Sequence, residues 1–427
     1  MLPAKRRTPR PRGGIVVSVA RLDRKEFVER YGRFFGSSRI AAIERLGYLM
    51  IEASGEGPYV VDTEGRRFLD LWGVGGVHAL GHRNPVLLSA MRDALRTEDF
   101  GSLFHFSEAK GRLAETLART TPGRLEVTWP AVTGSEAIDQ ACKLARGATG
   151  RTQILHGDHG YHGVTGFALS MMGSPSMRAW AEPLIPDFQA VPYGDAGALA
   201  GAISERTAAV VLEPLRTDYD GRAPEPGYFA EVRRLCDLHG AKLVVDEVVT
   251  GMGRLGHLWG IDHWGIEPDM LVTAKGFSGG LYPMAAVVMR PGMLDFWGDD
   301  PYRIISSYAW SNVGAVVSRI AIEETEKILP RARAMGDRLG RVVDELAARH
   351  PALVRGVRRT GLLWALDFRD EMAGAFFVLG LFQRGVIVVA SAQNLAVPKL
   401  YPPLILEDEQ IAEFAEKAEE TLQSLGG

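Results

Sequence analysis

The chain has 427 residues, of which 46% are hydrophobic and 24% charged, and its formal net charge is −3. The length suits two or three domains with large cores, and the near-neutral charge argues against a nucleic-acid binder, which is usually strongly basic. No apolar run reaches the roughly 18 residues that cross a membrane. Two cysteines without a CxxC pair, Cys142 and Cys236, indicate free thiols and a cytoplasmic protein.

Residues 1–20 form a basic, proline-rich stretch that begins MLPAKRRTPRPRGG. Its apolar part, Ile15–Ala20, is shorter than the roughly 7–15 residues of a secretion-signal core. We expect a disordered tail. The alternative is a tether to nucleic acid or membrane.

Residues 21–80 form an N-terminal segment that we expect to pack with a smaller C-terminal domain. Apolar residues at helical spacing predict helix in residues 22–50. Tyr59–Val61 and Arg67–Leu69 then predict a hairpin across the turn at Asp62–Gly65.

Residues 81–305 alternate between short apolar runs and helical patterns, which predicts an α/β domain with a large, mainly parallel sheet covered on both faces. The predicted strands are Leu125–Trp129, Gln153–His156, Ala208–Leu212, Lys242–Val245 and Met270–Thr273. The predicted helices include Ser135–Arg146, Ala196–Ile203 and Gly227–His239.

Residues 306–427 predict a second, smaller α/β domain. Its predicted helices are Ser311–Ile328, Ala332–His350 and Glu407–Leu425, and its predicted strands are Leu363–Phe368 and Val386–Ala390.

Two strands of the large sheet end in residues with complementary chemistry. Leu243–Val245 run into Asp246, and Met270–Thr273 lead through Ala274 to Lys275. The carboxyl ends of parallel strands share one sheet edge, where ligands bind in open α/β folds. An amine can form a Schiff base with an aldehyde, and a carboxylate can keep a pyridine nitrogen protonated. The pair therefore suits pyridoxal phosphate (PLP) chemistry.

A second candidate site lies at the start of the helix near Ser135. Thr133 and Glu136 have the spacing of a capping box. The free N–H groups at such a helix start, with the Ser135 hydroxyl, can cradle a phosphate. A plain helix cap that binds nothing is the alternative.

The loop after the second predicted strand contains an aromatic ring and several histidines. Tyr161 can stack on a heteroaromatic ligand. The alternatives are a plain polar loop and a zinc site made by His156, His159 and His162. Zinc is disfavoured because cysteine or carboxylate ligands at the usual spacing are missing nearby, and we expect no metal.

The stretch Gly251–Gly256 matches the GxGxxG pattern of dinucleotide-binding proteins. That fold needs a helix directly after the motif. Gly260, Gly265 and Pro268 interrupt the residues that follow, so we expect no dinucleotide site here.

The chain resembles the class III (ω-) aminotransferase family of PLP-dependent enzymes. The likeness runs from about Gly57 to Leu406 and is carried by GPYVVDTEGRRFLDL, GHRNP, TGSEAIDQACKLAR, YHGVTG, LEPLRTDYDG, DEVVTGMGRLG, EPDMLVTAKGFSGGLYPMAA and LYPPLIL. It implies a PLP-dependent transferase fold of the aspartate-aminotransferase type, with residues 81–305 as the cofactor-binding domain.

The resemblance also implies an activity. An amino group would move between an amine or ω-amino acid and a keto acid by a ping-pong Schiff-base mechanism, in a homodimer whose active sites are shared between subunits. A PLP-dependent aminomutase of the glutamate-1-semialdehyde type, or a racemase, is a same-chemistry alternative. A non-catalytic scaffold is a more remote one.

Site residues follow from the resemblance. Lys275 would form the Schiff base and shuttle the proton, and Asp246 would hold the pyridine nitrogen. Glu213 would lie near the substrate. The other implied cofactor contacts are Gly134 and Ser135 at the phosphate, Tyr161, His162 and Val248 around the ring, and Ser307 of the partner subunit.

Three positions depart from the family's pattern. Val249 stands where a glutamine often bonds near the ring hydroxyl. Ser307 lies in SSYAWSNV and not in the usual Thr-aromatic-Gly-Asn-Pro context. Lys399 stands where an arginine often binds a substrate carboxylate, so the charge is kept and the bidentate fork is lost.

We hypothesise that Glu213 and Lys399 form a gate pair. The segment Trp72–Val77 and the patch Leu103–Phe106 are expected to line the substrate pocket, with Trp72 as a substrate contact. The aromatic, weakly charged character of these two segments suggests a substrate with an apolar or sugar-like part.

Overall fold

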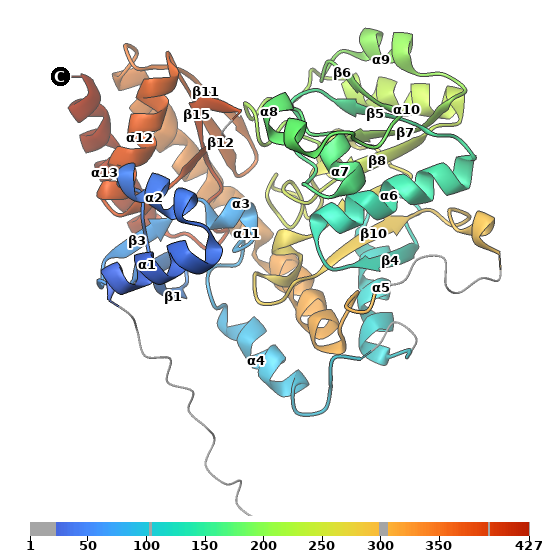
Figure 1. Ribbon diagram of the computed structural model, residues 1–427, viewed down its shortest axis with the longest axis horizontal. Coiled ribbons are helices and arrows are strands. Elements are labelled where there is room, and N and C mark those ends of the chain that lie inside the picture. Colours follow the sequence, from blue (N-terminus) through green and yellow to red (C-terminus); the bar gives the residue numbers. More distant parts are fainter. Residues whose placement is uncertain (1–22, 102–104, 299–305, 392, 427) are drawn as a thin grey trace, which may run out of the picture.

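The computed structural model describes residues 23–101, 105–298, 306–391 and 393–426, and the predicted tail at residues 1–20 lies outside them. Figure 1 shows two lobes side by side. One holds a large sheet between helices, and the other holds the C-terminal elements together with the N-terminal helices α1 (Arg24–Phe35) and α2 (Ser37–Arg45). No helix in these described ranges is long and apolar enough to cross a membrane.

Seven strands form the large sheet, in the order β4-β10-β9-β8-β7-β5-β6. Neighbours pair in parallel except for β10, which runs antiparallel to β4 and β9. The predicted large, mainly parallel sheet is confirmed. The strands are β4 (Val127–Ala131), β5 (Gln153–Gly157), β6 (Phe188–Val191), β7 (Thr207–Leu212), β8 (Lys242–Asp246), β9 (Met270–Thr273) and β10 (Ala285–Met289).

The sequence pattern does not predict β6 or β10. β6 lies at the edge of the sheet and its middle residues are exposed, so it lacks a buried apolar run. β10 is buried throughout, but a five-residue apolar run does not by itself distinguish a strand from a helical segment.

Residues of the central strands alternate between two apolar cores. Val244 of β8 packs on the side of helix α6 (Gly134–Thr149). Leu243 and Val245 belong to the opposite core, with residues of helix α10 (Tyr228–His239). Burial on both faces, worth about 25 cal/mol per Å² of apolar surface, fixes these strands and the edge at which they end.

The second lobe contains two four-stranded sheets, β11-β12-β15-β14 and β1-β2-β3-β13. The predicted hairpin is confirmed, because Tyr59 pairs with Leu69 and Val61 with Arg67. The elements are β1 (Glu52–Glu56), β2 (Tyr59–Asp62), β3 (Arg67–Asp70), β11 (Val354–Thr360), β12 (Leu363–Phe368), α12 (Glu371–Gln383), β13 (Val386–Ile387), β14 (Val389–Ser391), β15 (Asn394–Leu400) and α13 (Asp408–Gly426).

The segment Val386–Ser391 connects these two sheets. The sequence predicts one strand there, Val386–Ala390, and this is wrong. Val386–Ile387 pairs with β3, whereas Val389–Ser391 pairs with β15. Each half has a different neighbour across space, which a local apolar pattern does not show.

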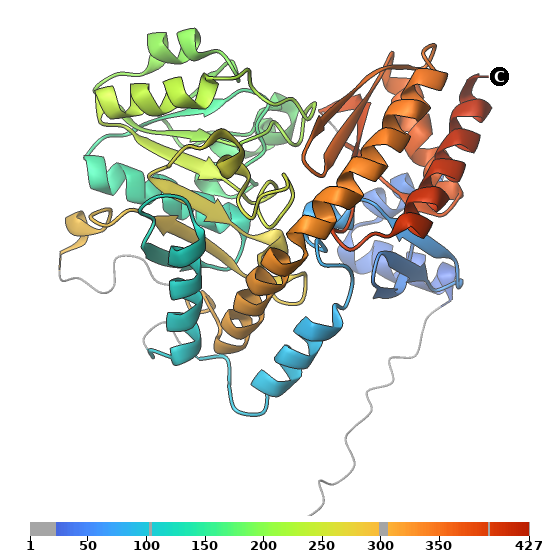
Figure 2. The same ribbon diagram turned by 180° about the vertical axis from the view of Figure 1, so that it is seen from behind.

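Helix α11 (Asn312–Arg349) runs between the two lobes (Figure 2). The sequence predicts two helices, Ser311–Ile328 and Ala332–His350, with a break at residues 329–331. The single continuous helix shows this break to be wrong. Pro330 is exposed and its neighbour Leu329 is buried, so packing of the helix outweighs the hydrogen bond that proline removes.

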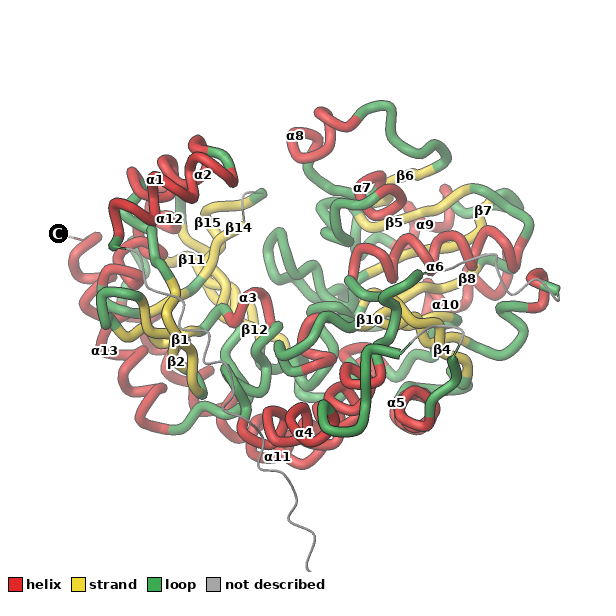
Figure 3. Tube along the Cα trace, turned by 60° about the horizontal axis from the view of Figure 1, so that its bottom comes forward, coloured by secondary structure: helices red, strands yellow, loops and turns green. Residues whose placement is uncertain are grey.

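Loops and short helices lie between the two lobes (Figure 3). The helical elements not yet given are α3 (Gly73–Gly76), α4 (Pro85–Ala94), α5 (Glu108–Thr120), α7 (Gly166–Ser170), α8 (Pro175–Arg178), α9 (Ala196–Ala202), η1 (Ala179–Ala181), η2 (Gly260–Trp264), η3 (Lys275–Ser278) and η4 (Asp295–Trp297).

Replacing Pro330 should stabilise the protein. Pro330→Ala restores an N–H inside a continuous helix at an exposed position, so the free energy of unfolding should rise by up to about 3 kcal/mol in urea titrations. The exposed Arg341→Ala on the same helix is the control and should change it by less than about 0.5 kcal/mol. A loss of stability in Pro330→Ala would contradict this account of the helix.

Candidate active site

A cavity of about 440 Å³ opens at the edge where the central strands of the large sheet end. It brings together residues that lie far apart in the sequence. The predicted site residues that line it are Gly134, Ser135, Tyr161, His162, Glu213, Asp246, Val248 and Lys275.

Asp246 ends β8, and its carboxylate is buried. His162 Nδ1 donates to Asp246 Oδ2 over 2.7 Å, and the N–H of Val248 donates to Asp246 Oδ1 over 3.0 Å. Burial opposes a charge on His162, but the hydrogen bond to Asp246 and the charge of Asp246 outweigh it and raise the pKa of the imidazole. His162 and the N–H of Val248 therefore hold the Asp246 carboxylate in one orientation.

Lys275 follows β9 and holds a left-handed backbone, with φ of 49°. A non-glycine residue there is strained, and such strain collects at functional sites. Burial lowers the pKa of Lys275, and the charges of Asp246, Glu213 and Asp218 oppose that shift. A desolvated amine of lowered pKa is a better nucleophile and proton carrier than an exposed lysine.

The start of α6 forms one corner of the cavity. The Thr133 hydroxyl accepts the N–H of Glu136 over 3.2 Å, while the Glu136 carboxylate accepts the N–H of Val132 over 2.8 Å. Gly163 passes so near that a Cβ there would lie 2.0 Å from Ser135 Oγ. This corner combines free helix N–H groups, a hydroxyl and close backbone approach, which suits a phosphate.

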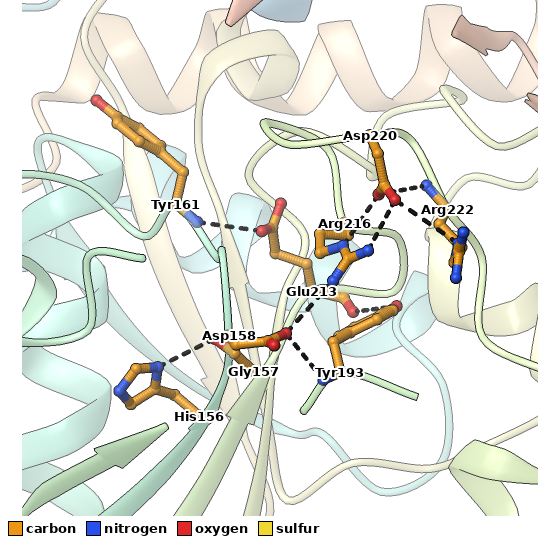
Figure 4. Close-up of polar contacts among 9 residues, drawn as sticks. All are labelled: His156, Gly157, Asp158, Tyr161, Tyr193, Glu213, Arg216, Asp220 and Arg222. Carbon is orange, nitrogen blue, oxygen red and sulfur yellow. Dashed lines mark hydrogen bonds and ion pairs between the residues drawn. The ribbon is translucent and has the colours of Figure 1, made fainter. Parts of the chain in front are cut away.

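Tyr161 and Glu213 meet on the other side of the cavity (Figure 4). The Tyr161 N–H donates to the Glu213 carboxylate over 3.3 Å, and the Thr217 hydroxyl donates to the same carboxylate. Burial raises the pKa of Glu213 to about 7, although the charge of His162 opposes this. Glu213 therefore changes charge near neutral pH.

A charged network holds the loop that carries Glu213. Figure 4 shows Arg216 between Asp158 and Asp220, at 3.3 Å and 2.7 Å. The Tyr193 hydroxyl donates to the carbonyl of Glu213 over 3.1 Å. These contacts tie the loop after β7 to the loop that leads to Tyr161.

Lys399 is buried and does not line the cavity. Its ammonium donates to the carbonyl of Asp218, while Glu213 bonds to Thr217 and Tyr161. Glu213 and Lys399 thus have different hydrogen-bond partners, although the charge of Glu213 acts on Lys399, and their role as a gate pair stays a prediction. Burial lowers the pKa of Lys399 to about 8.

Two further predicted residues also lie outside this cavity. Trp72 lines a second cavity, of about 420 Å³, beneath α1 and α2. Gly75 nevertheless lies beside both Trp72 and Lys275. A Cβ on Gly75 would be within 4 Å of Trp72 Nε1 and of Lys275 Nζ. Ser307 is exposed in a turn. Of the predicted patch Leu103–Phe106, residues 103 and 104 lie outside the described part of the chain.

Sequence reasoning missed Glu247, which is buried directly after Asp246. Its carboxylate accepts the Thr250 hydroxyl over 2.6 Å and the N–H groups of Gly260 and Ile261 over 2.9 Å and 2.6 Å. These bonds fold the GxGxxG stretch back on itself, and turns follow it instead of a long helix. The signal available in the sequence was Glu247 itself, an acidic residue directly before the apolar Val248 and Val249.

Comparisons with known proteins agree with this geometry. The sequence family described as aminotransferase class-III matches residues 42–422. An uncharacterized aminotransferase of Archaeoglobus fulgidus is 35% identical over 93% of this chain and 94% of its own length. A putrescine aminotransferase of Pectobacterium atrosepticum is 31% identical over 89% of this chain and 84% of its own length. The structure of a transaminase from a marine Virgibacillus superposes with a TM-score of 0.87 at 26% identity, covering 94% of this chain and 100% of that one.

The charge of Glu213 should make stability depend on pH. Its folded pKa of about 7 exceeds the ordinary 4.5, so the folded state binds the proton more tightly. The free energy of unfolding should therefore fall as pH rises from 4.5 to about 7, by an amount of the order of 3 kcal/mol from this group. Glu213→Gln should remove that part of the fall in urea titrations between pH 5 and 8.

The control is Glu231→Gln, at an exposed carboxylate whose pKa is lowered by its hydrogen bond from Arg234. That group stays ionised across the range, so the slope should not change. An equal slope in wild type and Glu213→Gln would contradict a raised pKa at Glu213.

Proposed function

The chain belongs to the class III aminotransferases, which are PLP-dependent enzymes, and we propose that its donor is a primary amine or ω-amino acid and its acceptor a keto acid. One observation supports the assignment of the site most directly. Lys275 and Asp246, a buried amine and a buried carboxylate, line one cavity whose far corner is the start of α6.

The residues present fit PLP. The start of α6 with Ser135 would hold the phosphate, because a Cβ on Gly163 would fill the space beside the Ser135 hydroxyl. Tyr161 and Val248, which line the same cavity, would enclose the ring. When bound, PLP supplies an aldehyde that condenses with amines and a ring that withdraws electrons from the substrate carbon.

Asp246 would keep a proton on the ring nitrogen. His162 contributes by holding that carboxylate in place with a hydrogen bond of 2.7 Å. Lys275 would carry a proton to and from the substrate carbon, because burial lowers its pKa and favours the neutral amine, whereas an exposed lysine stays protonated at neutral pH. Val249 lines the cavity with an apolar surface, so the contact that a glutamine would make there is absent in this chain.

Glu213 and Trp72 are the proposed substrate contacts. Glu213 lines the cavity, and Trp72 lines the second cavity, with its Nε1 and Lys275 Nζ both beside Gly75. We assign Lys399 an indirect role, because it holds the Asp218 carbonyl in the loop that carries Glu213. The name of the Pectobacterium relative makes putrescine the first donor to test.

We also propose a homodimer with shared active sites. Ser307 and Tyr308 are exposed, and the ring of Tyr308 packs edge-on against Phe100 at 5.0 Å. An exposed aromatic pair of this kind suits a subunit interface. Ser307 would then reach the phosphate bound to the partner. We place the reaction in the cytoplasm, in keeping with the buried free thiols of Cys142 and Cys236.

Removing the proposed amine tests the function. Lys275→Ala should lose the visible absorbance band of the purified protein, and putrescine-to-keto-acid transfer should fall by about 10²–10⁴-fold, the usual effect of losing a positioned acid–base group. Lys242→Ala, at the opposite end of β8, is the control and should keep both. A band and activity that survive in Lys275→Ala would refute the assignment, and product appearing only as a rearranged donor would indicate an aminomutase.

Substitution of Lys399 should weaken binding of the keto-acid acceptor more than binding of the cofactor. Lys399→Met removes a charge-assisted hydrogen bond to Asp218, so the KM for the keto acid should rise about tenfold while the visible band is kept. Lys417→Met breaks a partly exposed ion pair with Glu413 and is the matched control. Unchanged KM in Lys399→Met would remove Lys399 from the substrate site.

A further inference from the structure

The residues beside Lys275 form a turn of unusual backbone conformation. Gly73, Val74, Gly75 and Gly76 all have positive φ, of 53°, 53°, 67° and 95°. Three of them are glycines, which adopt this conformation at little cost, but Val74 is β-branched and is strained there. Strain persists only where the surroundings over-determine it.

This turn lies between the amine of Lys275 and the second cavity. A Cβ on Gly75 would lie 3.5 Å from Lys275 Nζ. On its other side, the second cavity of about 420 Å³ is lined by Trp72, Val74 and His78. Because a cavity and not a packed core lies behind it, apolar packing from that side does not hold the turn in place.

A buried carboxylate holds the start of the turn. Asp70 Oδ1 accepts the N–H of Trp72 over 3.1 Å and that of Gly73 over 2.8 Å. Its Oδ2 accepts Nε2 of His82 over 2.8 Å. Asp70 and His82 are 3% and 6% exposed, so this hydrogen bond is shielded from water and strengthened by the low local dielectric.

His78 links His82 to the far end of the turn. Its ring stacks on that of His82, with centroids 3.9 Å apart, and its backbone N–H donates to Gly73 over 3.1 Å. On the far side, its Nδ1 abuts Gly280, where a Cβ would stand 2.5 Å away. Gly280 belongs to the segment that follows Lys275 and lines the first cavity, so His78 contacts both the turn and the lining of that cavity.

We propose that Asp70, His82 and His78 are positioning residues that form a polar relay holding the turn 73–76 against the amine of Lys275. The relay sets where a substrate carbon can stand next to that amine, without itself touching substrate. The proposal rests on the proposed function in taking Lys275 as the reacting amine.

Two properties favour this role over simple packing. Burial, with the charge of His82, lowers the pKa of His78 to about 4, so its ring is neutral and stacks on His82 without repulsion. Within the described part of the chain, the Nδ1 of His78 is buried without a hydrogen-bond partner. A polar group kept at such a cost indicates that the placement of the ring matters.

The test uses two variants of the cofactor-bound enzyme. His82→Phe keeps the ring stack and loses the hydrogen bond to Asp70, and Asp70→Asn keeps the shape and loses the charge. Amide hydrogen exchange in the peptide 72–80 should accelerate about tenfold, and the rate constant of the half-reaction with saturating putrescine should fall about tenfold, with KM changed less, as expected for one charge-assisted hydrogen bond.

The matched control is His350→Phe, which removes another histidine–carboxylate contact, the 3.0 Å pair with Glu419. It should leave both measurements unchanged. Unchanged exchange in both folded variants would overturn the proposal. Faster exchange with an unchanged half-reaction would also overturn it, since the turn would then be held but would not position the amine.

Failure of the proposed function would give a different experimental result from failure of the positioning role. A wild-type protein without a band that depends on Lys275 would remove Lys275 as the reacting amine, and the positioning role with it. The exchange measurement would still report whether Asp70 and His82 hold the turn. If His82→Phe does not fold, the Asp70→Asn variant alone provides both the hydrogen-exchange and the half-reaction measurement.

Discussion

The buried carboxylate of Asp246 is the group on which the arrangement of the site depends. An ion removed from water costs several kcal/mol unless partners surround it. Here the partners are His162, in the loop after β5, and the N–H of Val248, directly after β8. They meet because β5, β7 and β8 pair in parallel and end at the same edge. The charge kept there in turn opposes the effect of burial on Lys275.

The chemistry of the site follows from local sequence, because its principal residues stand at strand ends. Asp246 and Lys275 each follow a short apolar run, and that pattern is enough to place both on one edge of a parallel sheet. The cap at Thr133 is equally local. The class of the fold is predicted for the same reason, since alternating strands and helices leave few ways to cover a parallel sheet.

The remaining features depend on contacts that a linear pattern does not contain. Lys399 has the right charge for a carboxylate, but the carbonyl of Asp218, from the other lobe, takes its ammonium. Pro330 looks like a helix break until the packing of α11 on both lobes is known. The pairing of His162 with Asp246 likewise joins residues 84 positions apart. In each case the deciding partner is distant in sequence.

The pairing of β3 with β13 has a consequence for biosynthesis. Leu69 pairs with Val386, so the outer edge of the N-terminal hairpin has no partner until that late residue leaves the ribosome. The seven-stranded sheet, by contrast, has all its strands once Met289 has been made. Through most of translation, Phe68 and Leu69, buried in the finished protein, belong to a strand with one unpaired edge. Such edges recruit other chains, so the waiting hairpin is a point at which the nascent polypeptide is open to aggregation.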